Sequence, residues 1–546
     1  MYRFFRSLVP AVRLSAVLFL VMACWVSRGH AQTVITWSNG VSGTITVGAN
    51  WVGGVAPVSP GTQTWTGTSA LITGGTAIIA SQNVYSGTMT IDATGVVASS
   101  TNATMSLRPL ALSNAGSIRH ANSGTLTIIQ TSTALTNSGV IEVTGPGALK
   151  FNTSNTVISN TSGLIRATAG LLDTSLQTFT INGGTLAIEA GAAQLTSTAN
   201  ATYTLNNVQV ANAGTMSVVK SSFPGGNRTF TYSLAGTGTF NNSGIVNLTF
   251  NEGAGAGTQT NDTTSMVFGS SRTVINTGTI NISQLNTQLT GTGVWPLFMS
   301  GSSAFTNQGR INISTVTNAT ETASLRWSTA LGNAGVMVVD GPKSSIQLGS
   351  QAFTQSGAAS ALSLTNGGRI VAGSVTISSG TLLGTGTVSA PATIGGIVAP
   401  GSGGIGTLNM GGNVTWNAGN AWQFELGTAA ASLAAASAGS STQDLMAITG
   451  NFTKGTGSGF TFDFLQSEST GWYKIADWTG STTFLAGDFS GTNLQPGNTA
   501  NFTVDATTSA LYVEIVPEPG ALALAAAGAA TAFLVAWRRS RQRQTA

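Results

Sequence analysis

A short motif recurs through the middle of this chain, and it limits the possible folds more than any other feature. Each copy has an Asn, a small residue, a Gly, a variable residue and then alternating apolar positions. Nine copies keep this spacing, a tenth carries one insertion, and successive motif glycines lie 21 to 34 residues apart. The ten copies begin at Asn114, Asn137, Asn160, Asn182, Asn212, Asn242, Asn276, Asn307, Asn333 and Asn366. Repeats of this length are typical of stacked units, so we expect one solenoid turn per copy.

The chemistry of the motif indicates what each turn contains. Asn and Gly both tolerate left-handed backbone angles, which predicts a tight corner, and the alternation that follows predicts a half-buried strand. No helical periodicity is evident between residues 32 and 515. We therefore predict an all-β chain that folds as a right-handed parallel β-helix with β caps. It would rise about 4.8 Å per turn and carry a ladder of stacked Asn side chains. The alternative is a sandwich of antiparallel hairpins, because Asn-Gly corners also close hairpins.

A second pattern lies within residues 380–426. It reads Gly-Thr-Leu-Leu-Gly-Thr-Gly-Thr-Val from Gly380, and Pro-Gly-Ser-Gly-Gly-Ile-Gly-Thr-Leu from Pro400. This stretch resembles the passenger-associated repeat of autotransporters and large bacterial adhesins, and the resemblance implies a β-helix. The residues after it lack the many amphipathic strands of an outer-membrane barrel, so we do not expect export through a barrel of the chain's own.

These patterns divide the chain into five parts. We expect a signal peptide at 1–31, an N-terminal β cap region at 32–105, solenoid repeats at 106–428, a C-terminal β unit at 429–515 and a terminal segment at 516–546. Caps are needed because a solenoid otherwise exposes open strand edges. Trp37, Trp51 and Trp65 lie in the first cap region. We interpret them as cap and core residues, with a carbohydrate-stacking face as the alternative.

The N-terminus predicts export. A basic start precedes an apolar run at residues 14–26 and the small-residue site Gly29-His30-Ala31, which is the pattern of a secretory signal cleaved between Ala31 and Gln32. The alternative is a lipoprotein signal, because Val-Met-Ala-Cys ending at Cys24 resembles a lipobox. Cys24 is the single cysteine of the chain. Cleavage at Ala31 would leave no cysteine, so no disulfide would stabilise the mature protein.

The C-terminus carries three features in order. Pro517, Glu518 and Pro519 are followed by an apolar segment at residues 521–537, and a group of arginines comes next. The arginines are Arg538, Arg539, Arg541 and Arg543. The apolar segment has about the length of one transmembrane helix through a thin bilayer. The positive-inside rule then keeps the arginines in the cytoplasm as a stop. A plain tail anchor with a coincidental Pro-Glu-Pro is the alternative interpretation.

This order of Pro-Glu-Pro, helix and Arg cluster resembles the PEP-CTERM sorting signal of Gram-negative bacteria that make exopolysaccharide. The resemblance implies that a membrane-embedded exosortase recognises Pro517, Glu518 and Pro519. It also implies that the inner-membrane precursor is then cleaved and released to the cell surface or matrix. Signal peptidase and exosortase would be partners during export. The same segment occurs on some proteins described as ice-binding.

Charge argues against several functions. Only 7% of the residues are charged, with a formal net charge of +4. Eight arginines lie at the two ends, so residues 32–515 carry 13 basic and 16 acidic residues. The basic residues of this body are scattered singly, whereas phosphate-backbone binding needs them clustered. We therefore expect no nucleic-acid partner.

Catalytic groups are few. After Ala31 the chain has one histidine, His120, which we expect to face solvent, and no P-loop or zincin motif. We predict no catalytic residue, metal or cofactor. A polysaccharide lyase or glycosidase is the enzyme alternative, with acids such as Asp92, Glu142, Asp173 and Glu189, the last two being 16 residues apart.

Ice binding is a further alternative, which needs a regular face of Thr-x-Thr pairs. Such pairs occur at irregular spacing, at Thr44/Thr46, Thr88/Thr90, Thr125/Thr127, Thr229/Thr231, Thr277/Thr279 and Thr385/Thr387. The prediction that we favour is a surface or extracellular-matrix structural, adhesin-like rod associated with exopolysaccharide, with affinity from many weak hydrogen bonds.

Overall fold

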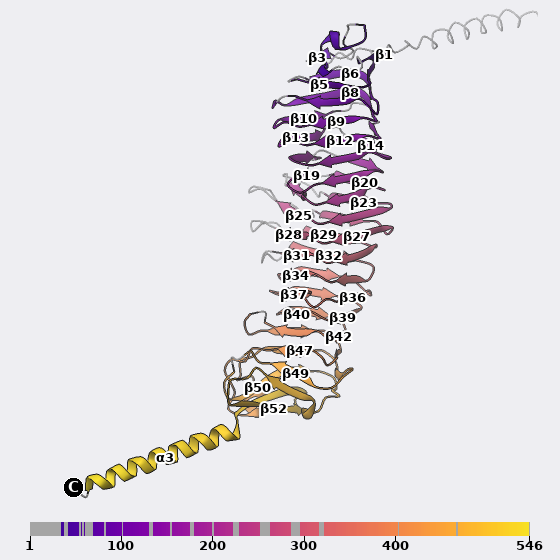
Figure 1. Ribbon diagram of the computed structural model, residues 1–546. Helices are drawn as coiled ribbons and strands as arrows, with labels where there is room; N and C mark the ends of the chain where they lie inside the picture. The colour runs from indigo at the N-terminus through magenta and orange to yellow at the C-terminus, as the bar shows by residue number, and fades with distance from the viewer. Residues whose placement is uncertain are drawn as a thin grey trace, which may run out of the picture.

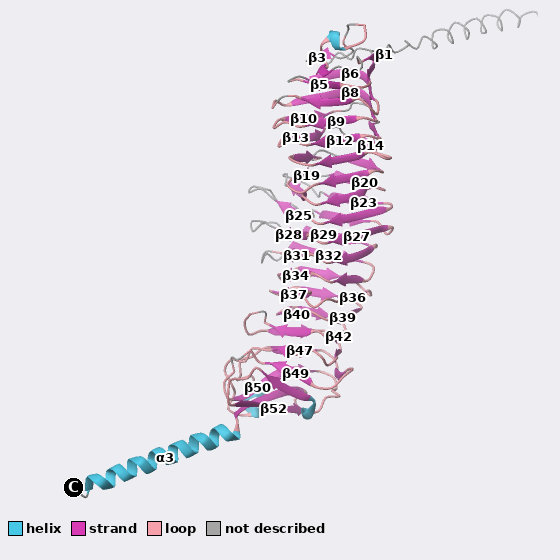
Figure 2. Ribbon diagram, viewed as in Figure 1, coloured by secondary structure: helices cyan, strands magenta, loops and turns pink. Residues whose placement is uncertain are grey.

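The protein is a long stack of short β-strands that ends in one helix (Figures 1 and 2). The computed structural model describes residues 34–544, apart from 38–41, 54–55, 57–58, 61–68, 81–82, 101, 130–134, 153–155, 175–178, 199–200, 222–228, 252–262, 285–294, 316–320, 402 and 466–467. Most turns of the stack contain three strands. For example, β12 (Val140–Val143), β13 (Ala148–Phe151) and β14 (Thr156–Ser159) make one turn, and β15 (Leu164–Ala167) then pairs in parallel with β12. The strands therefore form three faces.

The first face contains seventeen strands, each in parallel with the next. It comprises β2 (Ser42–Thr44), β5 (Thr76–Ile79), β7 (Val96–Ser99), β9 (Ser117–His120), β12, β15, β18 (Thr185–Ile188), β21 (Gln209–Asn212), β24 (Gly238–Asn242), β27 (Arg272–Asn276), β30 (Ala304–Asn307), β33 (Leu331–Asn333), β36 (Ala352–Gln355), β39 (Ser374–Ile377), β42 (Ala392–Ile394), β45 (Val414–Trp416) and β48 (Phe452–Lys454). Sixteen spacings of about 4.8 Å give a rod of about 77 Å.

The second and third faces follow the same rule. The second comprises β10 (Thr125–Ile128), β13, β16 (Leu171–Asp173), β19 (Ala193–Thr198), β22 (Thr215–Ser221), β25 (Ile245–Asn251), β28 (Thr279–Gln284), β31 (Arg310–Ser314), β34 (Val336–Asp340), β37 (Ala361–Thr365), β40 (Thr381–Gly384) and β43 (Ile397–Pro400). The third comprises β11 (Leu135–Asn137), β14, β17 (Phe179–Asn182), β20 (Ala201–Asn206), β23 (Thr229–Ala235), β26 (Thr263–Phe268), β29 (Trp295–Gly301), β32 (Glu321–Trp327), β35 (Ser344–Gln347), β38 (Arg369–Val371), β41 (Thr387–Ser389), β44 (Thr407–Met410) and β47 (Leu445–Ile448).

Parallel pairing decides between the two predicted architectures. Within the described residues, antiparallel ladders occur only near the two ends of the rod, at β3 (Ser59–Pro60) with β6 (Asn83–Ile91) and at the C-terminal strands. A sandwich of hairpins would be antiparallel throughout, so the β-solenoid prediction is confirmed. Its right-handed sense agrees with the general preference of parallel crossovers and stays a prediction.

The coil extends beyond the range expected for the repeats. At the N-terminal end, β1 (Val34–Thr36), β4 (Ser69–Ile72), β6 and β8 (Met105–Asn114) pair in parallel in that order. The expected N-terminal cap region therefore contributes turns of the same coil. The long β8 serves two faces, because its first part pairs with β10 and its last part with β11.

The C-terminal end closes the rod with a change of strand direction. β47 and β48 still continue the coil. β50 (Gly471–Trp478) and β52 (Asn498–Asp505) then flank β53 (Ala510–Pro517) in antiparallel pairing. A small sheet of β46 (Trp422–Gln423), β49 (Phe460–Asp463) and β51 (Phe489–Thr492) lies in the same unit, with the short helix α2 (Leu433–Ser437) and the 3₁₀ turn η2 (Ala486–Asp488). A second 3₁₀ turn, η1 (Gly48–Asn50), lies at the other end of the rod.

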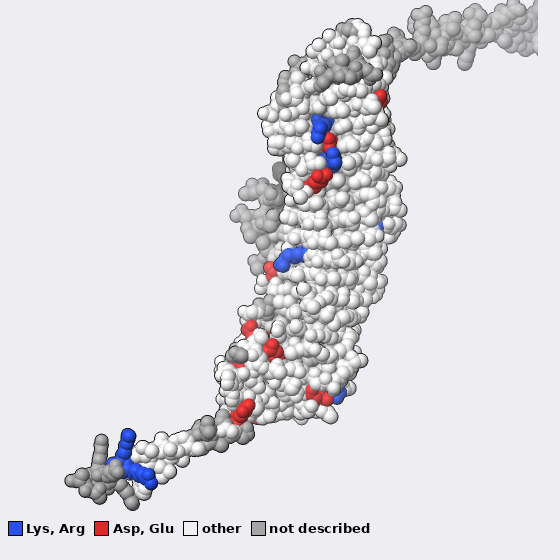
Figure 3. Space-filling view, in the orientation of Figure 1, with Lys and Arg blue, Asp and Glu red and all other residues white. Residues whose placement is uncertain are grey.

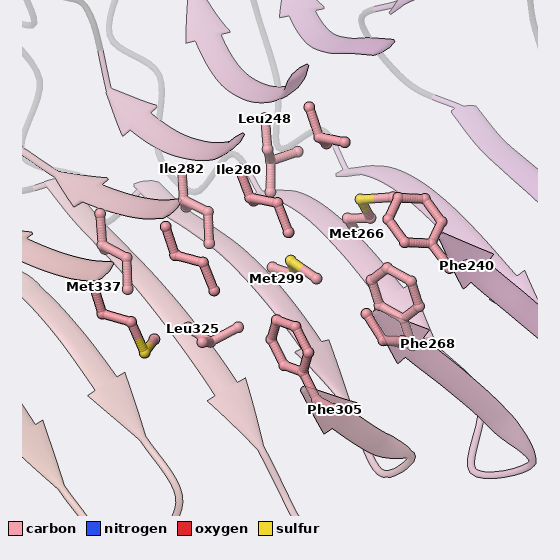
Figure 4. Packing of buried hydrophobic residues seen from close by; sticks show 14 of the residues in the cluster. Phe240, Leu248, Met266, Phe268, Ile280, Ile282, Met299, Phe305, Leu325 and Met337 are labelled. Carbon is pink, nitrogen blue, oxygen red and sulfur yellow. The ribbon is translucent and has the colours of Figure 1, made fainter. Parts of the chain in front are cut away.

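The core fills the inside of the coil along its whole length. Alternate residues of each strand point inward, as in β23 and β28, and rows of apolar side chains from successive turns pack against one another (Figure 4). Aromatic rings continue these rows, for example Tyr203 on Tyr232 with ring centroids 4.7 Å apart. Such ring pairs contribute to the packing between successive turns. Because these contacts join adjacent turns, each turn is stabilised mainly by its two neighbours.

The reason for glycine in the motif differs from the prediction. Left-handed angles occur only in the copies that begin at Asn182 and Asn366. In most other copies the backbones of adjacent turns approach too closely for a side chain. A Cβ on Gly278 would lie 2.1 Å from the carbonyl oxygen of Gly244, and one on Gly335 would lie 2.0 Å from that of Gly309. The motif glycine is therefore required mainly by turn-to-turn contact.

The predicted asparagine ladder is confirmed, and its buried rungs form two pieces. In the first piece, the Asn114 amide donates to Asn137 and Asn137 donates to Asn160, at the corner after the third-face strands. The second piece lies after the first-face strands. It runs from Asn212 through Asn242, Asn276 and Asn307 to Asn333, with N···O distances of 2.7 or 2.8 Å, and ends on Gln355. All of these side chains are buried.

Arg272 occupies the region where the ladder changes corners. Its buried guanidinium donates to the carbonyl oxygens of Leu205, Val208 and Ala235 in the two preceding turns, at 2.8 to 3.0 Å. Burial lowers the pKa of this guanidinium to about 10. One side chain therefore donates hydrogen bonds to three backbone carbonyl groups close to this corner.

Candidate functional site

The second face carries an open groove on its outer side. Strands β22, β25, β28 and β31 line it, and its volume is about 550 Å³. The lining residues are Ser217, Val219, Asn247, Thr249, Asn281, Ser283, Asn312 and Ser314. Parallel register places Asn247, Asn281 and Asn312 in one row, and Thr249, Ser283 and Ser314 in a second row. The groove is thus a short grid of amides and hydroxyls.

The amide row is internally hydrogen-bonded. Asn281 donates its Nδ2 to Asn247 Oδ1, and Asn312 donates its Nδ2 to Asn281 Oδ1, both at 2.8 Å. Arg310 Nε donates to Asn312 Oδ1 at 2.8 Å. A carboxamide has two N–H donors and two acceptor lone pairs, so each amide keeps hydrogen-bonding capacity for a ligand. The bonds within the row hold the amides in fixed orientations.

The groove is electrically neutral, since none of its lining side chains is ionisable. Figure 3 shows that the visible surface of the rod is mostly uncharged, with charges in a few small groups. One such group lies on the first face, where Glu142 pairs with Arg119 at 3.2 Å and with Arg166 at 2.6 Å. This group lies on another face than the grid, which is bordered by one described cation, the Arg310 guanidinium that contacts Asn312.

The acid pair weighed for an enzyme is not assembled. Asp173 pairs with Lys150 on the second face at 3.3 Å, whereas Glu189 lies 3.9 Å from Arg166, a first-face residue. The two carboxylates thus face different sides of the rod. Asp92, the other isolated acid, accepts hydrogen bonds from Thr94, and these lower the pKa of its carboxyl even though burial acts in the opposite direction.

His120 lies elsewhere than predicted. Its ring is buried at the end of β9, with Nδ1 2.6 Å from Ser99 Oγ and Nε2 2.9 Å from the carbonyl oxygen of Gly124. Burial lowers the pKa of the imidazole. The prediction of a solvent-facing residue was wrong, because the ring completes an inward row and satisfies a corner carbonyl. Across the described residues, no group of three or more His, Cys, Asp or Glu side chains could hold a metal ion.

The tryptophans of the N-terminal region are core residues where the structure describes them. Trp37 and Trp51 are buried and pack edge to face, with ring centroids 4.9 Å apart. The stacking-face alternative is wrong for these two, and Trp65 lies outside the described residues. The Thr pairs also fail to form one face, since Thr125 and Thr127 lie on the second face and Thr229 and Thr231 on the third.

The passenger-like stretch at residues 380–426 forms stacked turns, and the buried carboxyl of Asp444 accepts hydrogen bonds from its backbone. Asp444 accepts hydrogen bonds from the backbone N–H groups of Gly406 and Glu425, both at 2.8 Å. Burial raises the pKa of Asp444 to about 7 in spite of these bonds, and the nearby Glu425 carboxylate adds to the effect. This carboxyl therefore joins the glycine-rich loop after Pro400 to the C-terminal unit.

The Pro-Glu-Pro tripeptide lies at the end of the C-terminal unit. Pro517 ends β53 and is opposite Asn498, while the backbone N–H of the exposed Glu518 donates to the carbonyl oxygen of Gly497. Pro519 begins the helix α3 (Pro519–Gln544), which leaves the rod (Figure 1).

The arginines predicted as a stop lie in this helix, and Arg538 and Arg539 are exposed. Arg541 and Arg543 lie in its last turns, and their side chains are not among those described. A search of the described residues finds no helix with the length and apolar character needed to span a membrane. The side chains of residues 521–526, in the apolar segment, are not described, and Cys24, Ala31 and Gln32 lie outside the described residues.

The outer amide row was missed at the sequence level, although a signal was present. Asn247, Asn281 and Asn312 each stand between two apolar residues of a strand, three positions after a motif glycine. Their common position follows once the turns are aligned. Compared with known proteins, the chain matches no protein-family model and no curated protein.

Proposed function

We propose that this protein is an exported structural rod of the cell surface or extracellular matrix, which binds exopolysaccharide through the groove on its second face. The observation that carries the proposal is the neutral grid of amides and hydroxyls on four successive turns. Sugar hydroxyls both donate and accept hydrogen bonds, as do the groups of the grid. Single bonds of this kind contribute little in water, so affinity would come from a polymer that contacts several turns at once.

The export route in this proposal rests on the two ends of the chain. Cleavage between Ala31 and Gln32 releases the N-terminus, and the apolar segment at residues 521–537 holds the precursor in the inner membrane of a Gram-negative cell. An exosortase then recognises Pro517, Glu518 and Pro519, and the rod passes to the surface. The exposed position of Glu518, next to the start of α3, supports access to this tripeptide.

Binding is tested by co-sedimentation of the purified full-length chain with the exopolysaccharide of the producing cell. We expect the wild type to sediment with the polymer and the triple variant N247A/N281A/N312A to lose most of this binding. The control is Asn409→Ala, which removes an exposed strand asparagine on the third face. Equal binding by the triple variant and the wild type would refute the role of the groove.

Sorting is tested by following the size of the chain in the producing cell. We expect replacement of Pro517 and Glu518 by Ala to leave the full-length precursor in the membrane fraction. Unchanged processing would refute the assignment of the sorting signal without affecting the binding test.

A further inference from the structure

A second groove lies on the third face, at the ends of strands β26, β29, β32 and β35, and has a volume of about 530 Å³. Its apolar floor includes Phe268, Trp327 and Leu348, and its polar rim includes Ser300, Arg326 and Gln347. Register places the three rim residues opposite one another on successive strands. Unlike the first groove, this one combines an apolar surface with a cation.

A glycine makes room for the indole ring at the base of the groove. β29 ends at Gly301, and a Cβ there would lie 2.5 Å from the indole ring of Trp327. The indole is buried, and its Nε1 donates to the carbonyl oxygen of Ser303 at 2.6 Å. The ring therefore occupies the space that a side chain at position 301 would fill, and the floor is held in place from below.

Arg326 is fixed in orientation, and no acidic side chain in the described part of the chain pairs with it. Its guanidinium lies 4.3 Å from the centre of the Phe298 ring, and its Nε donates to Ser324 Oγ at 2.9 Å. No carboxylate of the described residues forms an ion pair with it. Stacking on a ring uses the flat side of a guanidinium and leaves the N–H groups at its edge available. The two terminal nitrogens can therefore donate to an oxyanion in the groove.

We propose that this groove binds an acidic sugar unit of a polysaccharide, with Arg326 donating two hydrogen bonds to its carboxylate. The proposal rests on the polysaccharide association proposed above and adds a second site with a defined ligand class. Planar carboxylates match the fork of a guanidinium. The sugar hydroxyls would contact Ser300 and Gln347, while the almost fully buried Phe268 and Trp327 support the groove from beneath.

The chemistry separates this site from the groove on the second face. A cation in a partly buried groove favours an anionic ligand, and added salt weakens that attraction. The grid has no ionisable lining side chain, and the Arg310 guanidinium at its edge is already bonded to Asn312, so we expect a weaker preference for charge there. We therefore expect polymer binding at the two grooves to depend differently on the charge of the polymer and on ionic strength.

The test measures binding of the full-length chain to polygalacturonate, dextran sulfate and neutral dextran. We expect Arg326→Gln to weaken polygalacturonate binding by about tenfold or more, and Arg326→Lys to restore only part of it because the bidentate fork is absent. Arg369→Gln is the matched control, because Arg369 is an exposed arginine on the same face. Free glucuronate and added salt should both compete with polygalacturonate for the wild-type protein.

Each outcome bears on one proposal. Equal polygalacturonate binding by Arg326→Gln and Arg369→Gln would overturn the site, as would salt-independent binding by the wild type. Stronger dependence on Arg326 for dextran sulfate than for polygalacturonate would overturn the choice of a carboxylate. If the triple variant of the second face loses neutral polymer while Arg326→Gln loses only the acidic one, both proposals stand. Thermal unfolding of each variant checks that the rod is intact.

Discussion

Removing an internal rung of the asparagine ladder tests how much the ladder stabilises the rod. Asn276 accepts a hydrogen bond from Asn242 and donates to Asn307, both at 2.7 Å. Asn276→Ala would leave the buried Asn307 Oδ1 without that donor and would remove one of the two acceptors of Asn242 Nδ2, which keeps the carbonyl oxygen of Thr279. An unsatisfied buried polar atom costs about 1–3 kcal/mol and a net hydrogen bond about 1 kcal/mol. We therefore expect a loss of about 2–4 kcal/mol.

The first rung of the same ladder is the matched control. Asn212 donates to Asn242 at 2.7 Å, but its own Oδ1 has no hydrogen-bond partner among the residues that the structure describes. Asn212→Ala should cost about 1–3 kcal/mol, because only the donor side of this rung is used. Native-state hydrogen exchange at the neighbouring strands measures the local opening free energy, which suits a stack that is stabilised turn by turn. An equal or larger loss for Asn212→Ala would refute the ladder argument.

Three further substitutions test other contacts. Gly278→Ala should destabilise the rod by about 1–3 kcal/mol in chemical denaturation, because its Cβ would meet backbone, whereas Gly487→Ala, with open space around it, should stay within about 0.5 kcal/mol. The pKa of Asp444 is raised in the folded state to about 7. The contribution of Asp444 to stability should therefore be greatest below about pH 4 and be lost as the pH rises to about 7, so the difference in stability between the wild type and Asp444→Asn should change over this range in a denaturation series. Glu142→Gln should cost about 1–2 kcal/mol at low salt and less at high salt, because it removes the carboxylate between two arginines; an equal loss at both salt concentrations would contradict this.

The coil could be predicted from the sequence because each repeat marks the backbone positions of a corner and of the strand that follows it. A motif asparagine and glycine mark corners, and alternation marks strands, so the parallel stack and the ladder follow from residues such as Asn242 and Gly244. The motif did not mark the turns that contain β2, β5 and β7, which wind in the same way without it. The close approach at Gly278 was also missed, because it depends on contact between turns that lie far apart in sequence.

The candidate sites were harder to predict because each depends on register. Asn247, Asn281 and Asn312 are about thirty residues apart and meet only after the turns are aligned. Arg326 lies over a ring from the preceding turn, and no local pattern signals this contact. His120 shows the reverse case, in which a polar residue near a corner completes the inside of the coil.

The second piece of the inner ladder also has a direction. From Asn212 to Asn333, each amide donates to the side chain of the following turn, whereas the outer row of Asn312, Asn281 and Asn247 donates toward the preceding turn. The inner ladder is therefore polar. A stack cut between two of these turns would present amide N–H donors on the edge of its N-terminal piece and amide oxygen acceptors on the edge of its C-terminal piece.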